Sequence, residues 1–289
     1  MSTAALCLPM TAHTPANPPR DRAANMVGGL PMYLGNKAGV LALWPRLASR
    51  LRELGLGEVS DVPDWPQDYL GHWREPALLL SQACGYPLVT ALAGQVRVVG
   101  AFHYGVPGCD GFLCRSQVVV RANDPATKLA DLRGRRVAYN GTDSQSGYNS
   151  LRALVAPQAH NGAFFASHVE TGGHLKSVLA VRDNLADIAS IDCVSLAEFH
   201  RHAPDATQGI RVLCETAPYP GLPLITATGT SDASLADLRS VIAQAVDDPE
   251  LAPLWRALFI TGFEAVDEGA YQPIVAMREA ASALHYPAL

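Results

Sequence analysis

Small hydroxylated and amide side chains crowd one corner of the sequence, NGTDSQSGYNSL at positions 140–151, directly before a predicted helix. Backbone N–H groups at the start of a helix have no helical partner, and the positive end of the helix dipole attracts anions. Hydroxyl groups add hydrogen-bond donors without adding charge. Ser144, Gln145, Ser146 and Gly147 are therefore candidate anion ligands, although an ordinary N-cap by Asp143 or Ser144 explains part of the pattern.

A second corner repeats the design in ETGGHLKS, where Thr171 and two glycines precede His174 at the start of another predicted helix. The glycines allow close approach of a ligand to the backbone, and the imidazole can donate to an oxyanion. Gln82 in SQACGYP and Asp192 in IDCVS end two further predicted strands. Ligands of open α/β sheets gather at such strand ends, so we expect these side chains to share one site.

Composition and charge limit the classes of partner. Hydrophobic residues form 48% of the 289-residue sequence, and the formal net charge is -5 with a pI near 6.0. No Lys/Arg run is present and no apolar run reaches membrane-spanning length, which argues against binding to nucleic acid and against membrane insertion. A small anionic molecule is the expected ligand.

Short apolar runs alternate with helical patterns, which predicts an α/β fold with mainly parallel sheets. Two extended stretches, near 116–121 and 216–223, bracket a compact βαβαβ block and could cross between two lobes. The expected organisation is a flexible leader at 1–25, a first lobe at 26–118 plus 216–289, and a second lobe at 119–215. The leader shows no signal-peptide pattern, so sequence alone indicates a cytoplasmic protein.

NGTDSQSGYNSL, ETGGHLKSVLAVRDNLADIASIDCVSL and LLLSQACGYPL together resemble the phosphonate-binding type of periplasmic solute-binding proteins, the receptors of ABC importers. The resemblance extends over most of the chain from about Met26. It implies two α/β lobes joined by two crossing strands, a periplasmic location, no cofactor and an ABC transporter permease as partner. A sensor protein is an alternative partner.

The resemblance also implies roles for individual residues. Ser144, Gln145, Ser146 and Gly147 would hold the oxyanion with help from His174, and Thr171 lies in the same donor-rich turn. The first lobe would close over the ligand, and Asp192 would face the end of the ligand away from the phosphonate. The ligand-binding residues expected from that first lobe are Tyr33, Gln82, Tyr86 and Tyr104. The crossing segment YPGLP offers no acidic residue for an aminophosphonate amine, so the identity of the ligand stays open.

Two alternatives remain at this level. A cytosolic enzyme on the same two-lobed fold, acting on a small carboxylated or phosphorylated metabolite, could use His174, Asp192 and Cys193, but the sequence contains no recognisable catalytic motif. Cys109 and Cys114 lie in a Gly/Pro loop and, together with Cys84, could form a thiol-rich mouth for a soft oxyanion or a metal. Their irregular spacing is more typical of incidental buried thiols.

Overall fold

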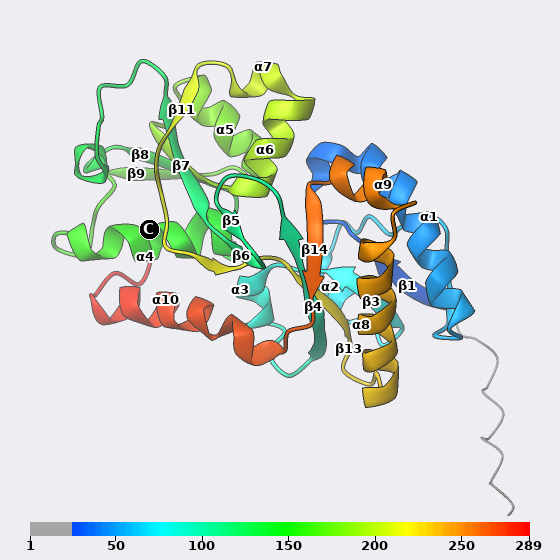
Figure 1. Cartoon of the computed structure of the whole chain (residues 1–289). Helices are drawn as coiled ribbons and strands as arrows, with labels where there is room; N and C mark the ends of the chain where they lie inside the picture. Colours follow the sequence, from blue (N-terminus) through cyan, green and yellow to red (C-terminus); the bar gives the residue numbers. More distant parts are fainter. Residues whose placement is uncertain (1–24) are drawn as a thin grey trace, which may run out of the picture.

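The computed structural model describes residues 25–289, which form two α/β lobes with a small third sheet between them (Figure 1). The predicted α/β class is confirmed. The predicted leader, residues 1–25, lies outside the described residues except for Asn25, which begins the first strand. In the described part of the chain, no helix has the length and apolar character needed to span a membrane.

The first lobe is built on a six-stranded sheet in the order β14-β4-β13-β3-β1-β2. Its middle strand LLLSQ is buried at every position because helices cover both faces, so its sequence is almost continuously apolar. The strands are β1 (Asn25–Gly29), β2 (Glu58–Val59), β3 (Leu78–Gln82), β4 (Val96–Tyr104), β13 (Pro223–Ala227) and β14 (Ile260–Glu264). The helices are α1 (Lys37–Glu53), α2 (Tyr69–Trp73), α3 (Gly85–Leu88), α8 (Asp232–Asp247) and α9 (Ala252–Ala257), with short turns η1 (Leu34–Asn36) and η5 (Glu268–Tyr271).

The second lobe is built on a five-stranded sheet in the order β11-β7-β10-β8-β9. Val118 and Val120 face one apolar cluster and Val119 faces another, so β7 packs on both sides. The strands are β7 (Ser116–Arg121), β8 (Arg136–Tyr139), β9 (Ser167–Glu170), β10 (Ile188–Asp192) and β11 (Ile210–Glu215). The helical elements are η2 (Leu129–Leu132), the π-turn η3 (Gln145–Asn149), α4 (Ser150–Val155), η4 (Ala156–Gln158), α5 (His174–Arg182), α6 (Cys193–His202) and α7 (Pro204–Thr207).

Both large sheets are mixed, so the expected mainly parallel arrangement holds for only part of each. β1 pairs in parallel with β2 and β3, and β8 pairs in parallel with β9 and β10. The strands next to the crossings, β4, β7, β11 and β13, make antiparallel pairs. A strand whose chain has just crossed from the other lobe, such as β7 or β13, is antiparallel to a neighbouring strand of the lobe that it enters.

The lobes are joined through a three-stranded sheet of β5 (Cys109–Asp110), β6 (Leu113–Cys114) and β12 (Tyr219–Pro220). Tyr219 pairs with Cys114, so the outgoing and returning chains are hydrogen-bonded to each other where they cross. We call this element the hinge sheet. The hinge sheet lies close in the chain to residues 116–121 and 216–223, the two extended stretches that the sequence predicted as crossings.

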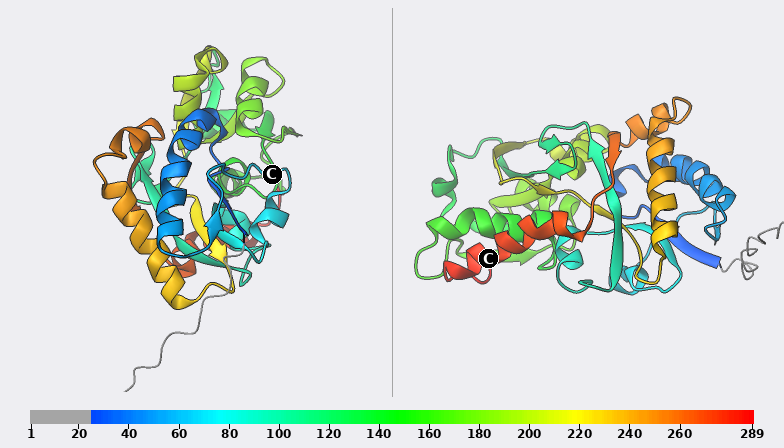
Figure 2. Two further views of the ribbon diagram at one scale, coloured as in Figure 1. Left: turned by 90° about the vertical axis from the view of Figure 1, so that its right-hand side faces the viewer. Right: turned by 60° about the horizontal axis from the view of Figure 1, so that its bottom comes forward.

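The final helix, α10 (Gln272–Ala283), differs from the predicted assignment of 216–289 to the first lobe. It lies along α4 of the second lobe (Figures 1 and 2), and Ala281 and Tyr286 belong to that lobe's core, whereas Ile274 near its start belongs to the first lobe's core. The helix therefore reaches both lobes and makes a third connection between them. β14 carries only a weak strand pattern in the sequence, since it has a central glycine and partly exposed side chains.

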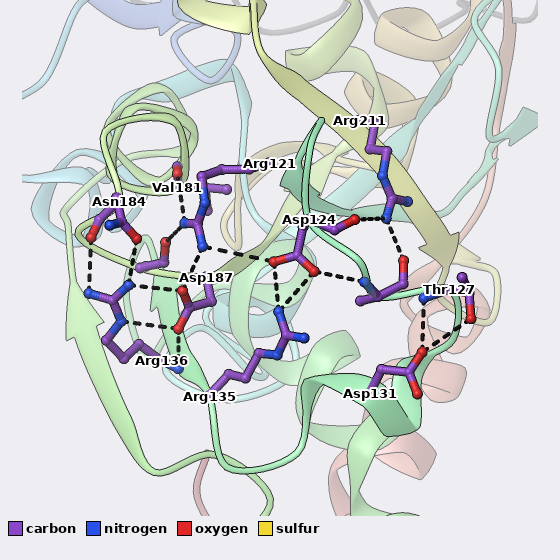
Figure 3. A network of polar contacts seen from close by, with 12 residues as sticks. Arg121, Asp124, Thr127, Asp131, Arg135, Arg136, Val181, Asn184, Asp187 and Arg211 are labelled. Atoms are coloured by element: carbon purple, nitrogen blue, oxygen red, sulfur yellow. Dashed lines mark hydrogen bonds and ion pairs between the residues drawn. The ribbon is translucent and has the colours of Figure 1, made fainter.

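An ion-pair network closes the end of the second sheet at which β8 and β10 begin (Figure 3). Asp187 accepts from Arg121 at 2.8 Å and from Arg136 at 2.9 Å, and Asp124 accepts from Arg135 at 2.6 Å. The Arg136 guanidinium keeps the pKa of Asp187 well below its usual range. Because Asp192 and Tyr139 lie at the other ends of these strands, the network stabilises the lobe without entering the site described below.

Arg152 carries the attachment of the last helix. Its guanidinium is buried and donates to the carbonyl oxygens of Pro287 at 2.6 Å and Arg278 at 3.0 Å, and to Asn149 Oδ1 at 3.2 Å. No carboxylate pairs with it among the described ion pairs. The charge is therefore stabilised by backbone carbonyls of α10 and the segment after it, together with the Asn149 amide of η3.

We expect Arg152→Met to lower the free energy of unfolding by about 2 to 4 kcal/mol, because several hydrogen bonds to a buried cation are lost. Amide exchange over 272–286 should accelerate. Arg278→Met, on α10, is the matched control because it removes only a loose 3.7 Å contact with Glu279. We expect it to change the free energy of unfolding by no more than about 0.5 kcal/mol. Equal effects of the two changes would contradict this role.

Candidate functional site

The two donor-rich corners meet in the structure. Ser146 lies in the π-turn after β8, and His174 begins α5 after β9. Ser146 Oγ and His174 Nε2 are 2.8 Å apart, although 28 residues separate them in the chain. Parallel pairing of β8 with β9 brings the two strand ends together and produces this contact.

The backbone carbonyl of Ser146 is held by three serine hydroxyls. Ser116 and Ser190 each donate to it at 2.8 Å, and Ser150 donates at 2.9 Å. Ser116 Oγ also lies 2.6 Å from Tyr219 OH, which belongs to the hinge sheet. This buried network fixes the position of the π-turn relative to β7, β10 and the hinge.

His174 is neutral at physiological pH because burial lowers the pKa of its imidazole to about 4. Its Nδ1 atom is buried and has no hydrogen-bond partner. Nearby, Gly147 packs so tightly against Asn140 that a Cβ there would collide with Asn140 Oδ1, which also lacks a partner. Buried polar atoms of native proteins are nearly always paired, so these two atoms are candidates for hydrogen bonds to a bound ligand.

The first lobe contributes aromatic hydroxyls. Tyr33 and Tyr104 pack edge to face with centroids 5.3 Å apart, and Gln82 Nε2 donates to Tyr104 OH at 2.8 Å. The hydroxyls of Tyr33 and Tyr271 are buried without partners. Two more hydrogen-bonding groups are thus left unused in the first lobe.

Asp192 is the acidic group of this centre. Its carboxylate caps α6 by accepting from Ser195 N at 2.8 Å, and burial raises its pKa to about 7. Burial raises the pKa of Tyr33 and of Tyr104, both from the first lobe, and the charge of Asp192 raises these pKa values further. Asp192 therefore lies where the two lobes face each other.

A second buried carboxylate bridges the lobes. Glu198 on α6 accepts from Gly35 N at 2.9 Å, and burial raises its pKa to about 7. A Cβ at Gly35 would lie 2.6 Å from Glu198 Oε2, so this approach requires glycine. Gln145 N also donates weakly to Cys84 Sγ across the interface at 3.5 Å. The lobes are in contact, as in a closed receptor.

Several predicted ligands are occupied by other contacts. Ser144 Oγ accepts from Gly147 N at 3.0 Å, so this pair forms the ordinary helix cap. The Gln145 side chain lies against Met277 of α10, and the Thr171 hydroxyl bonds with Tyr139 O and Ser177 Oγ inside its own turn. Tyr86 is half-buried within α3, and its backbone carbonyl accepts from the Thr90 hydroxyl.

Functional candidates absent from the sequence prediction share one property, which is a polar group buried at a strand end or between the lobes. Serines inside apolar strands, as in DIASID, are the signal that could have identified some of them. They are Asn140, Ser116, Ser150, Ser190, Glu198, Tyr219 and Tyr271.

Two surface pockets lie on the first lobe, away from these residues. One of about 640 Å³ lies between α1, α8 and α9, and one of about 430 Å³ lies beside α2. Neither contains any residue of the predicted site. The site residues instead pack against one another, so a ligand would need the lobes to separate before it could enter.

The centre can donate hydrogen bonds without supplying positive charge. The described hydrogen bonds and ion pairs of Ser146, His174, Tyr33 and Asp192 include no Lys or Arg side chain. Neutral, preorganised donors in a buried site suit a small oxyanion whose charge is spread over several oxygens.

Glu198 predicts a pH dependence of stability. The pKa of Glu198 is raised from 4.5 to about 7 in the folded protein. Its contribution to the free energy of unfolding is therefore fully present below its unfolded pKa and is lost as the pH rises through 7. Glu198→Gln keeps the acceptor for Gly35 N, so it should equal the parent near pH 4.5 and exceed it by roughly 2 to 3 kcal/mol at pH 8. Denaturant unfolding at both pH values measures this difference. Exposed Glu279→Gln is the control, and a difference that is independent of pH would refute the argument.

Comparison with solved structures supports the fold. A binding protein component of an ABC phosphonate transporter, PA3383 from Pseudomonas aeruginosa, superposes with a TM-score of 0.73 at 16% identity, covering 91% of this chain and 88% of that one. PhnD1 from Prochlorococcus marinus in complex with methylphosphonate gives 0.71 at 14% identity, covering 89% and 98%. XAC2383 from Xanthomonas citri bound to ATP gives 0.68 at 19% identity, covering 90% and 98%.

These relatives confirm the predicted two-lobed fold. No curated protein matches the sequence significantly. The sequence itself matches a family described as ABC transporter, phosphonate, periplasmic substrate-binding protein, over residues 73–271. Because this match spans more than half of the chain, the protein belongs to the periplasmic substrate-binding proteins of ABC phosphonate transporters, a family of receptors rather than enzymes.

Proposed function

We propose that this chain captures a small tetrahedral oxyanion of the phosphonate or phosphate class between its two lobes. The observation that carries the proposal is the contact of Ser146 Oγ with His174 Nε2 at 2.8 Å, next to a buried His174 Nδ1 that has no partner. The hydroxyl of Tyr33 supplies another unpaired group from the opposite lobe. A bound oxyanion would pair groups that are otherwise left without hydrogen bonds.

The ligand is held by neutral groups in this proposal. An imidazole with a pKa near 4 stays uncharged, so its contribution is directional hydrogen bonding rather than ion pairing. Asp192 faces the non-phosphonate end, where its carboxyl can accept from a ligand donor when ionised and donate when protonated. Its pKa of about 7 makes both states accessible near neutral pH.

Closure of the lobes completes the site. Tyr33 and Tyr104 come from the first lobe, whereas Ser146, His174 and Asp192 come from the second. A ligand that contacts both groups binds the closed form better than the open form and shifts the population toward it. The family description supports delivery of the ligand to an ABC permease.

A true ligand should compact the protein in solution scattering and raise its melting temperature by mass action. Methylphosphonate, phosphate, phosphite and sulfate are the first compounds to screen. If none of them changes either observable while an uncharged metabolite changes both, the oxyanion proposal fails. Ligand uptake by cells with and without this chain tests the importer role separately, and intact binding with unchanged uptake would favour a sensor.

Ser146 and Ser144 form a matched pair for testing the site. Ser146→Ala removes the hydroxyl whose hydrogen bond to His174 Nε2 leaves Nδ1–H of the neutral imidazole to donate to the oxyanion. The change should weaken the affinity for the oxyanion about ten- to a hundredfold, since a hydrogen bond to a charged group contributes about 1.5 to 3 kcal/mol. Ser144→Ala removes only the cap on Gly147 N and should cost roughly 1 kcal/mol of stability.

Isothermal titration and thermal melts of both variants separate these effects. Equal affinities for Ser146→Ala and the parent protein would show that the corner is structural.

A further inference from the structure

Three sulfur atoms meet beside the hinge sheet. Cys109 Sγ lies 3.4 Å from Cys114 Sγ and 3.4 Å from Cys193 Sγ, and all three atoms lie within 4.8 Å of one another. All three residues are free thiols. Cys109 and Cys114 are direct partners across the β5-β6 hairpin, whereas Cys193 is 84 residues further along the chain than Cys109.

The cluster is buried and its backbone is shaped around it. Cys114 and Cys193 are each 1% exposed, and Cys109 is half-buried. Gly108 adopts a left-handed φ of +96°, and a Cβ there would lie 3.0 Å from Cys193 Cβ. A Cβ at Gly221 would lie 3.0 Å from Cys114 Sγ. Two glycines thus let the crossing segments approach the sulfurs.

The three thiols connect different parts of the fold. Cys109 and Cys114 belong to the hinge sheet, and Cys193 is the first residue of α6 in the second lobe, next to Asp192. Anything that binds all three sulfurs therefore ties the hinge to the second lobe. This feature is independent of the oxyanion proposal, since none of the three sulfurs is needed for the contact between Ser146 and His174.

We propose that Cys109, Cys114 and Cys193 form a three-sulfur binding site for a soft, thiophilic metal cation of the Cu(I) class. Three sulfurs at a metal–sulfur distance of about 2.3 Å stand about 4 Å apart in a trigonal arrangement. Two of the three sulfur pairs, now 3.4 Å apart, need to separate to about 4 Å.

The number and type of ligands select the ion. Structural zinc sites take four ligands, but the group of possible ligand atoms found in residues 25–289 contains only these three sulfurs. Soft sulfur ligands favour Cu(I).

The test uses the full chain, reduced and free of oxygen, in competition with Cu(I) held by the coloured bicinchoninate complex. We expect one Cu(I) per chain to be withdrawn, as measured by loss of colour and by native mass spectrometry. Cys193→Ser should lower the affinity by more than the roughly 10- to 100-fold that loss of an outer-shell partner typically costs. Cys7→Ser, Cys84→Ser and Cys214→Ser are the controls and should retain one ion per chain.

A second readout keeps the proposal falsifiable if a variant is unstable. The melting temperature of the parent protein should rise with free Cu(I), whereas that of Cys193→Ser should not. The proposal is overturned if the parent protein fails to compete for Cu(I), or if Cys114→Ser and Cys193→Ser bind it as tightly as the parent. It is also overturned if Cys84→Ser or Cys7→Ser abolishes binding.

Discussion

The carbonyl oxygen of Ser146 is the point on which the second lobe's binding corner depends. It accepts hydrogen bonds from Ser116, Ser150 and Ser190, which belong to β7, α4 and β10. A carbonyl can accept more than one hydrogen bond, and the π-turn leaves this one available for side chains. The same three contacts orient the Ser146 hydroxyl toward His174, and Tyr219 extends them to the hinge. The same hydrogen bonds therefore fix both the backbone of the π-turn and the position of the Ser146 hydroxyl beside His174.

The contact between the lobes combines favourable packing with costly burial of acids. Tyr33 and Tyr104 supply apolar surface and hydroxyls, whereas Asp192 and Glu198 are carboxyls whose ionised forms are disfavoured by burial. A receptor must open to exchange its ligand, so an empty closed state must not be too stable. Buried acids and unpaired hydroxyls at this interface weaken the empty closed form, and a bound ligand can satisfy part of their hydrogen-bonding capacity.

Three connections rather than two link the lobes, and they differ in character. The hinge sheet pairs Tyr219 with Cys114, which lets the two crossing chains bend as a unit. The third connection is α10, which Arg152 fastens to the second lobe through backbone carbonyls. Ile274 and Ala281 of α10 pack in the cores of different lobes, so lobe movement must also shift this helix relative to one of them. The sulfur cluster lies beside the first two connections, where a bound ion would affect the same motion.

The sequence by itself determined the α/β class, the two lobes and the two donor-rich corners, because apolar periodicity, glycine and capping residues act over a few positions. It also sufficed to relate the chain to phosphonate-binding receptors. Only the tertiary structure decided that Ser146 rather than Gln145 meets His174, that the end of α10 packs in the second lobe's core, and that Cys193 joins Cys109 and Cys114. These outcomes depend on how elements distant in the chain pack together. Local patterns contain little information about that packing, since one apolar helix face can cover either sheet.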